Sequence, residues 1–210
     1  MNQFSLKNVF KSGGLNKANF LSRIFGLFNE EPVRFWAEME STPYDYLGRP
    51  TLYPKGERGR TTLDFAFRRK SDGSVFVAEM KCEIAYQNYR FMTLTEVKQV
   101  QRHLNDQAKI NKKSFARFVE SATRPDNFNC RVTSRSGHKR EITINGSILV
   151  WGDVYSECRD KLIDHFGFGD ILSVQDIIND LITAKDPNYL EFMEQRSDWS
   201  KHLFDALSGK

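Results

Sequence analysis

The sequence predicts a single α/β domain, because patterns typical of helices and of strands alternate along the chain. A helical pattern over residues 15–28 precedes two strands within 61–84, a helix from about 95 to 110 and a continuous apolar strand at 147–151. A chain of 210 residues, 40% of them hydrophobic, is long enough to bury one substantial core. We therefore expect one domain that covers residues 1–210.

Composition narrows the classes of protein that need to be considered. The net charge of +4 is compatible with a polyanionic partner, but such a charge is common among unrelated proteins. The three cysteines show no CxxC spacing, so neither a disulfide framework nor a zinc knuckle is indicated. No signal peptide is evident, and no apolar run approaches the ~18–20 residues of a membrane span. We therefore expect a cytoplasmic protein without a membrane partner.

Two helices are predicted before the first strands. Apolar side chains recur at i, i+4, i+7 and i+8 within residues 15–28. Pro32 suits the first turn of a second helix, which is expected to end near Ser41. On that helix Glu40 shares a face with apolar residues, whereas Glu38 does not, so Glu40 is the acid expected to point toward the body. The alternative is a solvated helix end.

The segment 42–60 is rich in proline, glycine and tyrosine. This composition predicts a loop, with a short strand near residues 51–53. Arg58 and Arg60 lie there among tyrosines, and basic side chains next to aromatic ones suit the phosphates and bases of nucleic acids. The two arginines are therefore candidate nucleic-acid contacts, although ordinary surface loops have a similar composition.

Residues 61–84 contain the clearest structural signal. Asp72-Gly73 predicts a two-residue hairpin loop, which places Asp64 opposite Lys81 and makes Glu79 a diagonal neighbour on the same face. The opposite face is entirely apolar and consists of Leu63, Phe65, Phe67, Phe76, Ala78, Met80 and Cys82. Turn chemistry and hydrophobic pattern therefore agree on which residues share a face.

Asp64, Glu79 and Lys81 are the candidate catalytic residues. Two carboxylates this close repel each other, which raises their pKa values unless a cation lies between them. Mg²⁺ or Mn²⁺ prefers hard oxygen ligands and also binds phosphate oxygens, and the backbone carbonyl of Met80 could add a ligand. Lys81 would orient the attacking water and stabilise charge on the phosphate. The alternative is a surface strand with an ordinary Lys–Asp pair.

Asp64, an interval of fourteen residues and then Glu79-Met80-Lys81 resemble the signature of the PD-(D/E)xK nuclease superfamily. The resemblance implies a restriction-endonuclease-like core over about residues 15–155, with a central mixed β-sheet flanked by α-helices. It also implies a Mg²⁺- or Mn²⁺-dependent nuclease whose metal is held by Asp64 and Glu79, with DNA favoured as substrate. Leu63 stands where many members have a proline, which changes no ligand.

The resemblance also suggests accessory residues. Many members carry a glutamate on the first helix, but residues 15–28 contain no acid, so that role is unfilled or falls to Glu38 or Glu40. Gln99 and His103 resemble the Q-h-x-x-Y motif of RecB-type members, with histidine in place of tyrosine. Such a helix lies against the active site in those members; the alternative is an ordinary polar helix face.

Basic side chains also follow the helix of residues 95–110. A Ser136-Gly137 turn predicts the tip of a second hairpin, with strands near 130–135 and 139–144. Basic residues on a hairpin suit phosphate contacts, although a solvated surface hairpin has the same composition. The candidate contacts in this part of the chain are Lys112, Lys113, Arg135, Lys139 and Arg140.

The remaining chain, about residues 156–210, predicts a C-terminal helical elaboration with a possible strand at 170–173. It suits packing or dimerisation, so a homodimer or a larger nucleoprotein assembly is conceivable. Two other function classes remain open at this point. One is a non-catalytic nucleic-acid-binding or assembly module on the same fold, and the other is a metal-dependent hydrolase of small phosphodiesters.

Overall fold

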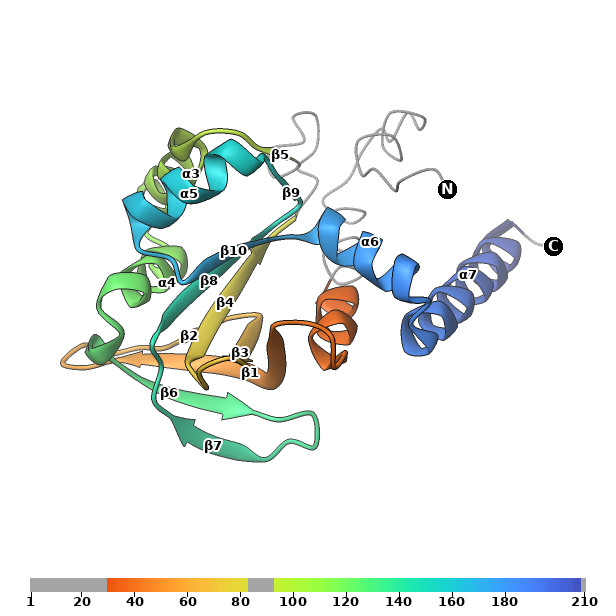
Figure 1. Cartoon of the computed structure of the whole chain (residues 1–210), viewed down its shortest axis with the longest axis horizontal. Coiled ribbons are helices and arrows are strands. Elements are labelled where there is room, and N and C mark those ends of the chain that lie inside the picture. The colour runs from red at the N-terminus through yellow and green to blue at the C-terminus, as the bar shows by residue number, and fades with distance from the viewer. Residues whose placement is uncertain (1–29, 83–92, 209–210) are drawn as a thin grey trace.

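The computed structural model describes residues 30–82 and 93–208, and the helix expected at residues 15–28 lies outside them (Figure 1). The described chain forms a mixed β-sheet flanked by helices, as the sequence predicts. The sheet has eight strands in the order β10-β8-β4-β3-β1-β6-β7, and β2 pairs with β1. Its strands are β1 (Tyr44–Pro54), β2 (Thr61–Thr62), β3 (Phe65–Arg69), β4 (Val75–Lys81), β6 (Phe128–Thr133), β7 (Lys139–Ile142), β8 (Gly146–Trp151) and β10 (Asp170–Ser173).

The sheet is parallel in one half and antiparallel in the other. Strands β4, β8 and β10 run parallel, whereas β3, β1, β6 and β7 pair with their neighbours in antiparallel fashion. A separate parallel pair joins β5 (Thr93–Leu94) to β9 (Asp153–Val154). The helices are residues 30–38, α3 (Val97–Lys109), α4 (Ser114–Thr123), the 3₁₀ helix η1 (Pro125–Asn127), α5 (Ser156–Phe166), α6 (Val174–Ala184) and α7 (Pro187–Ser208).

Both faces of the parallel half are covered by helices. One core contains Val77 and Leu149 from the sheet with Phe118 of α4, and the other contains Ile148 with Val33 of helix 30–38. Figure 1 shows α3, α4 and α5 grouped on one side and α6 with helix 30–38 on the other. A parallel strand covered on both faces needs a continuous apolar sequence, which explains the uniform burial of β8.

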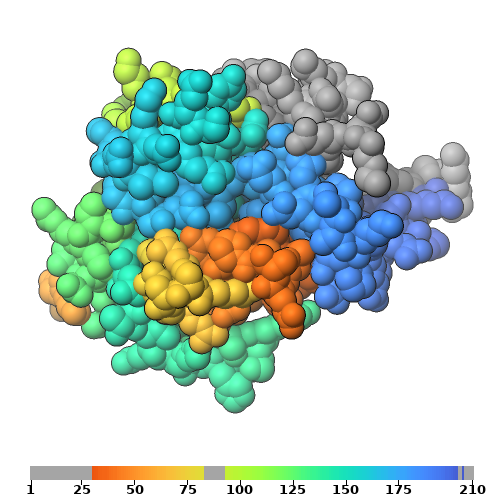
Figure 2. Space-filling model, in the orientation of Figure 1, coloured from red at the N-terminus to blue at the C-terminus, as the bar shows by residue number. Residues whose placement is uncertain are grey.

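Several predicted elements are confirmed with small changes in their ends. The helix expected at 95–110 is α3, the second hairpin is β6–β7, and the strand expected at 170–173 is β10. Because β10 pairs with β8, the C-terminal part contributes a strand to the sheet as well as helices. The hairpin β6–β7 forms one rim of the molecule (Figure 2). No helix within the described residues is long and apolar enough to cross a membrane.

The expectation of a loop over residues 42–60 is wrong for its first part, which is the long strand β1. Local composition suggested a loop, but β1 pairs with β3 on one side and with β2 and β6 on the other, and these partners are distant in sequence. A β-bulge between Tyr46 and Gly48 accommodates the glycine, whose φ of +127° lies in a region that side-chain-bearing residues rarely adopt.

Replacing Gly48 by alanine is expected to lower the free energy of unfolding by about 2–4 kcal/mol, because the strained φ and a clash act together. A Cβ atom at this position would lie 2.4 Å from the backbone oxygen of Thr133 on β6. Gly56→Ala is the control, since Gly56 also has positive φ but nothing lies within 4 Å. Urea denaturation of both variants measures the difference, and equal losses would contradict the role assigned to the close contact.

The register expected for the hairpin of β3 and β4 is wrong by two residues. Ala66 pairs with Val77 instead of Glu79, and Asp64, just before the paired residues of β3, donates its backbone N–H to Ala78 O at 3.2 Å instead of facing Lys81. A two-residue shift leaves the side chains of β3 and β4 on their expected faces. Asp64 also remains within electrostatic reach of Glu79, since its negative charge raises the pKa of Glu79.

The reason lies in the turn. A two-residue type I′ loop would require positive φ at both Asp72 and Gly73, but within the described chain only Gly73 of this pair has it. The Asp72 carboxylate instead accepts the Ser74 N–H at 2.9 Å, and Gly73 donates its N–H to Arg69 O at 2.9 Å. The loop therefore has four residues and closes between Arg69 and Ser74.

The alternating pattern of the sequence also assigns Leu63 to the wrong face of the sheet. Leu63 packs in the same core as Ala66 and Val77, not with Phe65, because the chain bends at Asp64 between β2 and β3. The other residues assigned to the apolar face, including Phe65 and Phe67, do share one core. At this bend the Asp64 side chain reaches the end of β4, where its Oδ2 accepts the backbone N–H of Met80 at 2.7 Å.

Candidate active site

Asp64, Glu79 and Lys81 converge at the carboxyl end of β4. Asp64 Oδ2 accepts the backbone N–H of Met80 at 2.7 Å, and Lys81 donates from Nζ to Glu79 Oε1 at 2.6 Å. The three side chains are 18%, 14% and 13% exposed, respectively. Glu79 and Lys81 point the same way because they are two residues apart on one strand. The convergence expected from the sequence is therefore present, in a largely desolvated position.

The electrostatic environment of Glu79 is unusual for a carboxylate. Its pKa is raised to about 7, first by burial and then by the negative charges of Asp64 and Glu30, while Lys81 opposes the shift. Removing a carboxylate from water disfavours its charged form unless a cation compensates. One lysine does not compensate fully for this group of acids, so the site is suited to an additional cation.

Glu30 is a residue that sequence reasoning missed. Burial raises its pKa first, and the charge of Asp64 raises it next, which places its carboxylate within electrostatic reach of the candidate pair. It lies on helix 30–38 two residues before Pro32, where the sequence predicts the first turn of the second helix. A sequence signal existed, because Glu30, Val33 and Ala37 share one helical face and the last two are fully buried.

Glu38 and Glu40 do not occupy the position that was expected of them. Glu38 is exposed and lies 3.8 Å from Arg34 on its own helix. Glu40 is exposed and follows the end of the helix at residue 38, and its backbone oxygen accepts from Lys70 Nζ at 3.0 Å. The helix ends earlier than predicted, and the acid of this helix within electrostatic reach of Asp64 is Glu30.

The donor set determines which metal the site could hold. Within residues 30–82 and 93–208, no three His, Cys, Asp or Glu side chains are grouped closely enough to form a complete metal cage. Mg²⁺ does not need such a cage, because it commonly takes one or two carboxylates and keeps several waters. Asp64 and Glu79 supply two hard oxygen ligands, and the Met80 carbonyl remains the candidate third. The residues therefore fit Mg²⁺ or Mn²⁺ with an open coordination sphere.

Gln99 has a structural role at the start of α3. Its Oε1 accepts the backbone N–H groups of Thr95 at 2.7 Å and Glu96 at 3.0 Å, and its Nε2 donates to Thr93 O at 2.9 Å. These bonds form a capping box with Glu96 and tie α3 to β5. The side chain is thus committed to the helix N-terminus, contrary to the substrate contact suggested by the motif.

Gln99→Ala is expected to lower the free energy of unfolding by about 1–2 kcal/mol, because it removes a helix cap. The variant should retain its response to Mg²⁺, since the side chain is not directed at the carboxylates. Gln101→Ala is the control, because Gln101 is exposed on the same helix and bonds Asn105 at 3.3 Å. Thermal unfolding with and without Mg²⁺ tests both statements, and loss of the metal response in Gln99→Ala would contradict them.

His103 approaches the candidate site through an aromatic ring. It is buried and packs edge-to-face on Phe115 of α4, with ring centroids 4.5 Å apart. Lys81 Nζ lies 5.6 Å from the centroid of the same ring. Phe115 thus lies close to both the lysine and the histidine. His103 has the surroundings of a packed core residue.

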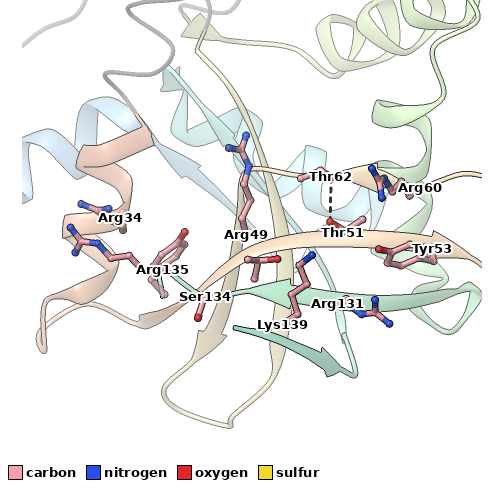
Figure 3. Close-up of a pocket in the computed structure, with 12 residues that line it drawn as sticks. Arg34, Arg49, Thr51, Tyr53, Arg60, Thr62, Arg131, Ser134, Arg135 and Lys139 are labelled. Atoms are coloured by element: carbon pink, nitrogen blue, oxygen red, sulfur yellow. Dashed lines mark hydrogen bonds between the residues drawn. The ribbon is translucent and has the colours of Figure 1, made fainter. Parts of the chain in front are cut away.

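A basic groove lies beside the site, on the side of β1, β6 and β7 that faces away from α4 (Figure 3). Its volume is about 500 Å³. Alternation along the strands explains its polarity, because Leu52, Cys130 and Val132 face the core and their neighbours face outward. No acidic side chain among the described residues lines it. Its cations are Arg34, Arg49, Arg60, Arg131, Arg135 and Lys139.

Arg49 connects the groove to the carboxylates. Its guanidinium lines the groove and lies 3.8 Å from Asp64 Oδ1, while its side chain stays 55% exposed. This position follows from the bulge in β1, after which the strand leaves β3 and pairs with β2. The carboxylates themselves do not line the groove. Arg49 is therefore the residue that contacts both the groove and the Asp64 carboxylate.

The predicted nucleic-acid contacts divide into two sets. Arg60, Arg135 and Lys139 line the groove. The others lie elsewhere. Lys113, near the start of α4, is 3.9 Å from Glu57. Arg140 follows Lys139 on β7, so its side chain points to the opposite face of the sheet. Arg58 and Lys112 are exposed and are likewise outside the groove lining. Sequence spacing alone did not separate these sets.

The chain matches no family model, no curated protein and no solved structure. The case for a function therefore depends on the residues themselves: two adjacent carboxylates, a lysine within hydrogen-bonding distance, and a basic groove joined to them through Arg49.

Proposed function

We propose that the protein is a metal-dependent nuclease that hydrolyses the phosphodiester bonds of nucleic acid. The observation that carries the proposal is the position of Asp64, Glu79 and Lys81 beside a groove lined by six cations and, among the described residues, by no acid. Clustered acids repel a polyanion, so a purely nucleic-acid-binding surface gains nothing from them. Acids that hold a divalent cation next to a phosphate-binding groove serve hydrolysis.

Each residue of the site has a proposed role. Asp64 and Glu79 would hold Mg²⁺ or Mn²⁺, and Glu30 adds negative charge from helix 30–38. The bound ion supplies Lewis-acid activation of the phosphate and of a water molecule. Lys81 orients the attacking water and stabilises negative charge that develops on the phosphate oxygens. The backbone N–H of Met80 holds Asp64 in position.

We also propose that the fold is a restriction-endonuclease-like core. Asp64 precedes β3 and the Glu79-Met80-Lys81 tripeptide ends β4, and these adjacent antiparallel strands belong to a mixed sheet between helices. Strand β8 then pairs in parallel with β4 after the helices α3 and α4. DNA is favoured over RNA only by the resemblance to the PD-(D/E)xK superfamily.

A plasmid-nicking assay tests the proposal directly. Supercoiled DNA, linear duplex and single-stranded circles are incubated with the protein in Mg²⁺, in Mn²⁺ and in excess EDTA. We expect cleavage of at least one form in either metal and none in EDTA. Binding of these substrates without metal-dependent cleavage of any of them would favour a non-catalytic binding or assembly module instead.

A further inference from the structure

The cations of the groove are only partly neutralised by the protein. Arg60, Arg135 and Lys139 form no ion pair with another described residue, whereas Arg131 is bonded to Glu141 at 3.0 Å. Like charges held together without counter-charges favour the binding of an anion. Figure 3 shows the cations spread along β1, from Arg135 at one end to Arg60 at the other. A linear array of this kind suits successive phosphates of one extended strand.

The width of the groove favours one nucleic-acid strand over two. The floor consists of three neighbouring strands, β1, β6 and β7, so it is about 10 Å across. The major groove of B-DNA alone is about 12 Å wide between its backbones, so the two backbones of a duplex do not fit side by side on this floor. A single sugar–phosphate backbone does fit.

Aromatic and hydroxyl groups of the groove favour a strand with unpaired bases. Tyr53 projects into the groove from β1, with the guanidinium of Arg131 5.7 Å from its ring centroid. In a duplex the bases are already stacked on each other, whereas unpaired bases stack on exposed aromatic rings. Thr51, Thr133 and Ser134 add hydroxyl groups that can bond phosphate or sugar oxygens.

We propose that the outer face of β1, β6 and β7 binds a single-stranded segment of nucleic acid, with a base stacked on Tyr53 and the backbone led past Arg49 to Asp64. This inference rests on the nuclease function proposed above and specifies its substrate. Arg135 and Lys139 hold the strand at the hairpin end of the groove, and Arg60 holds it at the other end. The substrate is then single-stranded nucleic acid or an unpaired region of a larger molecule.

Fluorescence anisotropy in EDTA, with a labelled oligodeoxynucleotide of about 12 residues and the matching duplex, tests the inference. We expect the single strand to bind at least about tenfold more tightly than the duplex. Tyr53→Leu should weaken single-strand binding by about tenfold, the usual effect of losing one stacked base, while Tyr53→Phe keeps the ring and the affinity. Arg135→Ala/Lys139→Ala should reduce the slope of log affinity against log salt by about 1.4.

Lys112→Ala/Lys113→Ala is the matched control, because it removes the same charge outside the groove. Equal binding of duplex and single strand, or wild-type affinity in Tyr53→Leu, would overturn the inference. Since binding is measured in EDTA, its result is independent of cleavage. Strand binding through Tyr53 without cleavage in Mg²⁺ would remove only the nuclease assignment, whereas metal-dependent cleavage without preference for unpaired strands would remove only this inference.

Discussion

Asp64→Asn is expected to lower the rate of metal-dependent cleavage by at least about 10³-fold, because it removes one of the two negative ligands of the proposed ion. The substitution is conservative for the fold, since the asparagine oxygen can still accept the Met80 N–H that Asp64 Oδ2 accepts at 2.7 Å. Lys81→Ala is expected to lower the rate to a similar extent while leaving metal binding in place. The nicking assay measures both rates.

Asp45→Asn is the control for this loss of charge. Asp45 lies on β1 and pairs with Arg68 at 2.8 Å on the surface, away from the proposed site. Its variant should cleave at the wild-type rate. Circular dichroism and thermal unfolding establish that Asp64→Asn is folded. Metal-dependent activity retained in both Asp64→Asn and Lys81→Ala would defeat the assignment of the catalytic residues.

The faces of the hairpin could be predicted because they depend on local alternation. Phe65 and Phe67 on one strand and Phe76 and Ala78 on the other are buried in one core, as their spacing indicates. The register could not be predicted as reliably, since Asp-Gly serves two-residue and four-residue loops alike. A shift of two residues changes neither face, so the hydrophobic pattern carries no information about it.

The features that sequence reasoning missed arise from contacts between distant segments. Strand β1 contains Pro50 and Gly48, which locally indicate a loop, and it is a strand because both its edges pair with other parts of the chain. Glu30 lies near Asp64 because helix 30–38 packs against the sheet through Val33 and Trp36. The helical spacing of Glu30 with Val33 and Ala37 indicates only that Glu30 faces the body, and no spacing identifies Asp64 as its neighbour.

The basic groove could not be predicted from the sequence either, because its residues come from distant segments. Two of its cations, Arg135 and Lys139, were expected to act together because they flank one turn. Arg34 and Arg49 were not, because one belongs to a predicted helix and the other to a supposed loop. The pairing of β1 with β6 brings these segments to one surface. Individual basic residues could be recognised from the sequence, but the surface that they share could not.

Glu79→Gln is expected to stabilise the protein in EDTA at pH 8 and to abolish its stabilisation by Mg²⁺. The pKa of Glu79 is raised to about 7 from its ordinary value of 4.5, so the folded state favours the neutral form of this group. That preference already includes the attraction of Lys81, which glutamine keeps as a hydrogen bond to its amide oxygen. Glutamine is neutral at every pH, so it avoids the cost of burying a charged carboxylate.

The sign of the pH dependence follows from linkage. A folded-state pKa above the unfolded value means that the stability associated with protonated Glu79 is present below about pH 4.5 and is lost as the pH rises toward about 7. At about 1.4 kcal/mol per pKa unit, the loss over this shift is about 3–4 kcal/mol. The wild-type protein should therefore lose stability relative to Glu79→Gln across this range, and the difference should be constant above it.

Thermal unfolding at pH 5, 6, 7 and 8 measures this difference, with a shift of about 2–4 °C expected for each kcal/mol in a chain of this size. Glu141→Gln is the control, because Glu141 is 78% exposed and lies on β7. Adding Mg²⁺ at about 100 times its dissociation constant should stabilise the wild-type protein by about 2.7 kcal/mol and leave Glu79→Gln unchanged. If the stabilities of the wild-type protein and of Glu79→Gln change in parallel with pH, the pKa of Glu79 is not raised in the folded state. If Mg²⁺ stabilises both proteins equally, Glu79 does not hold the metal.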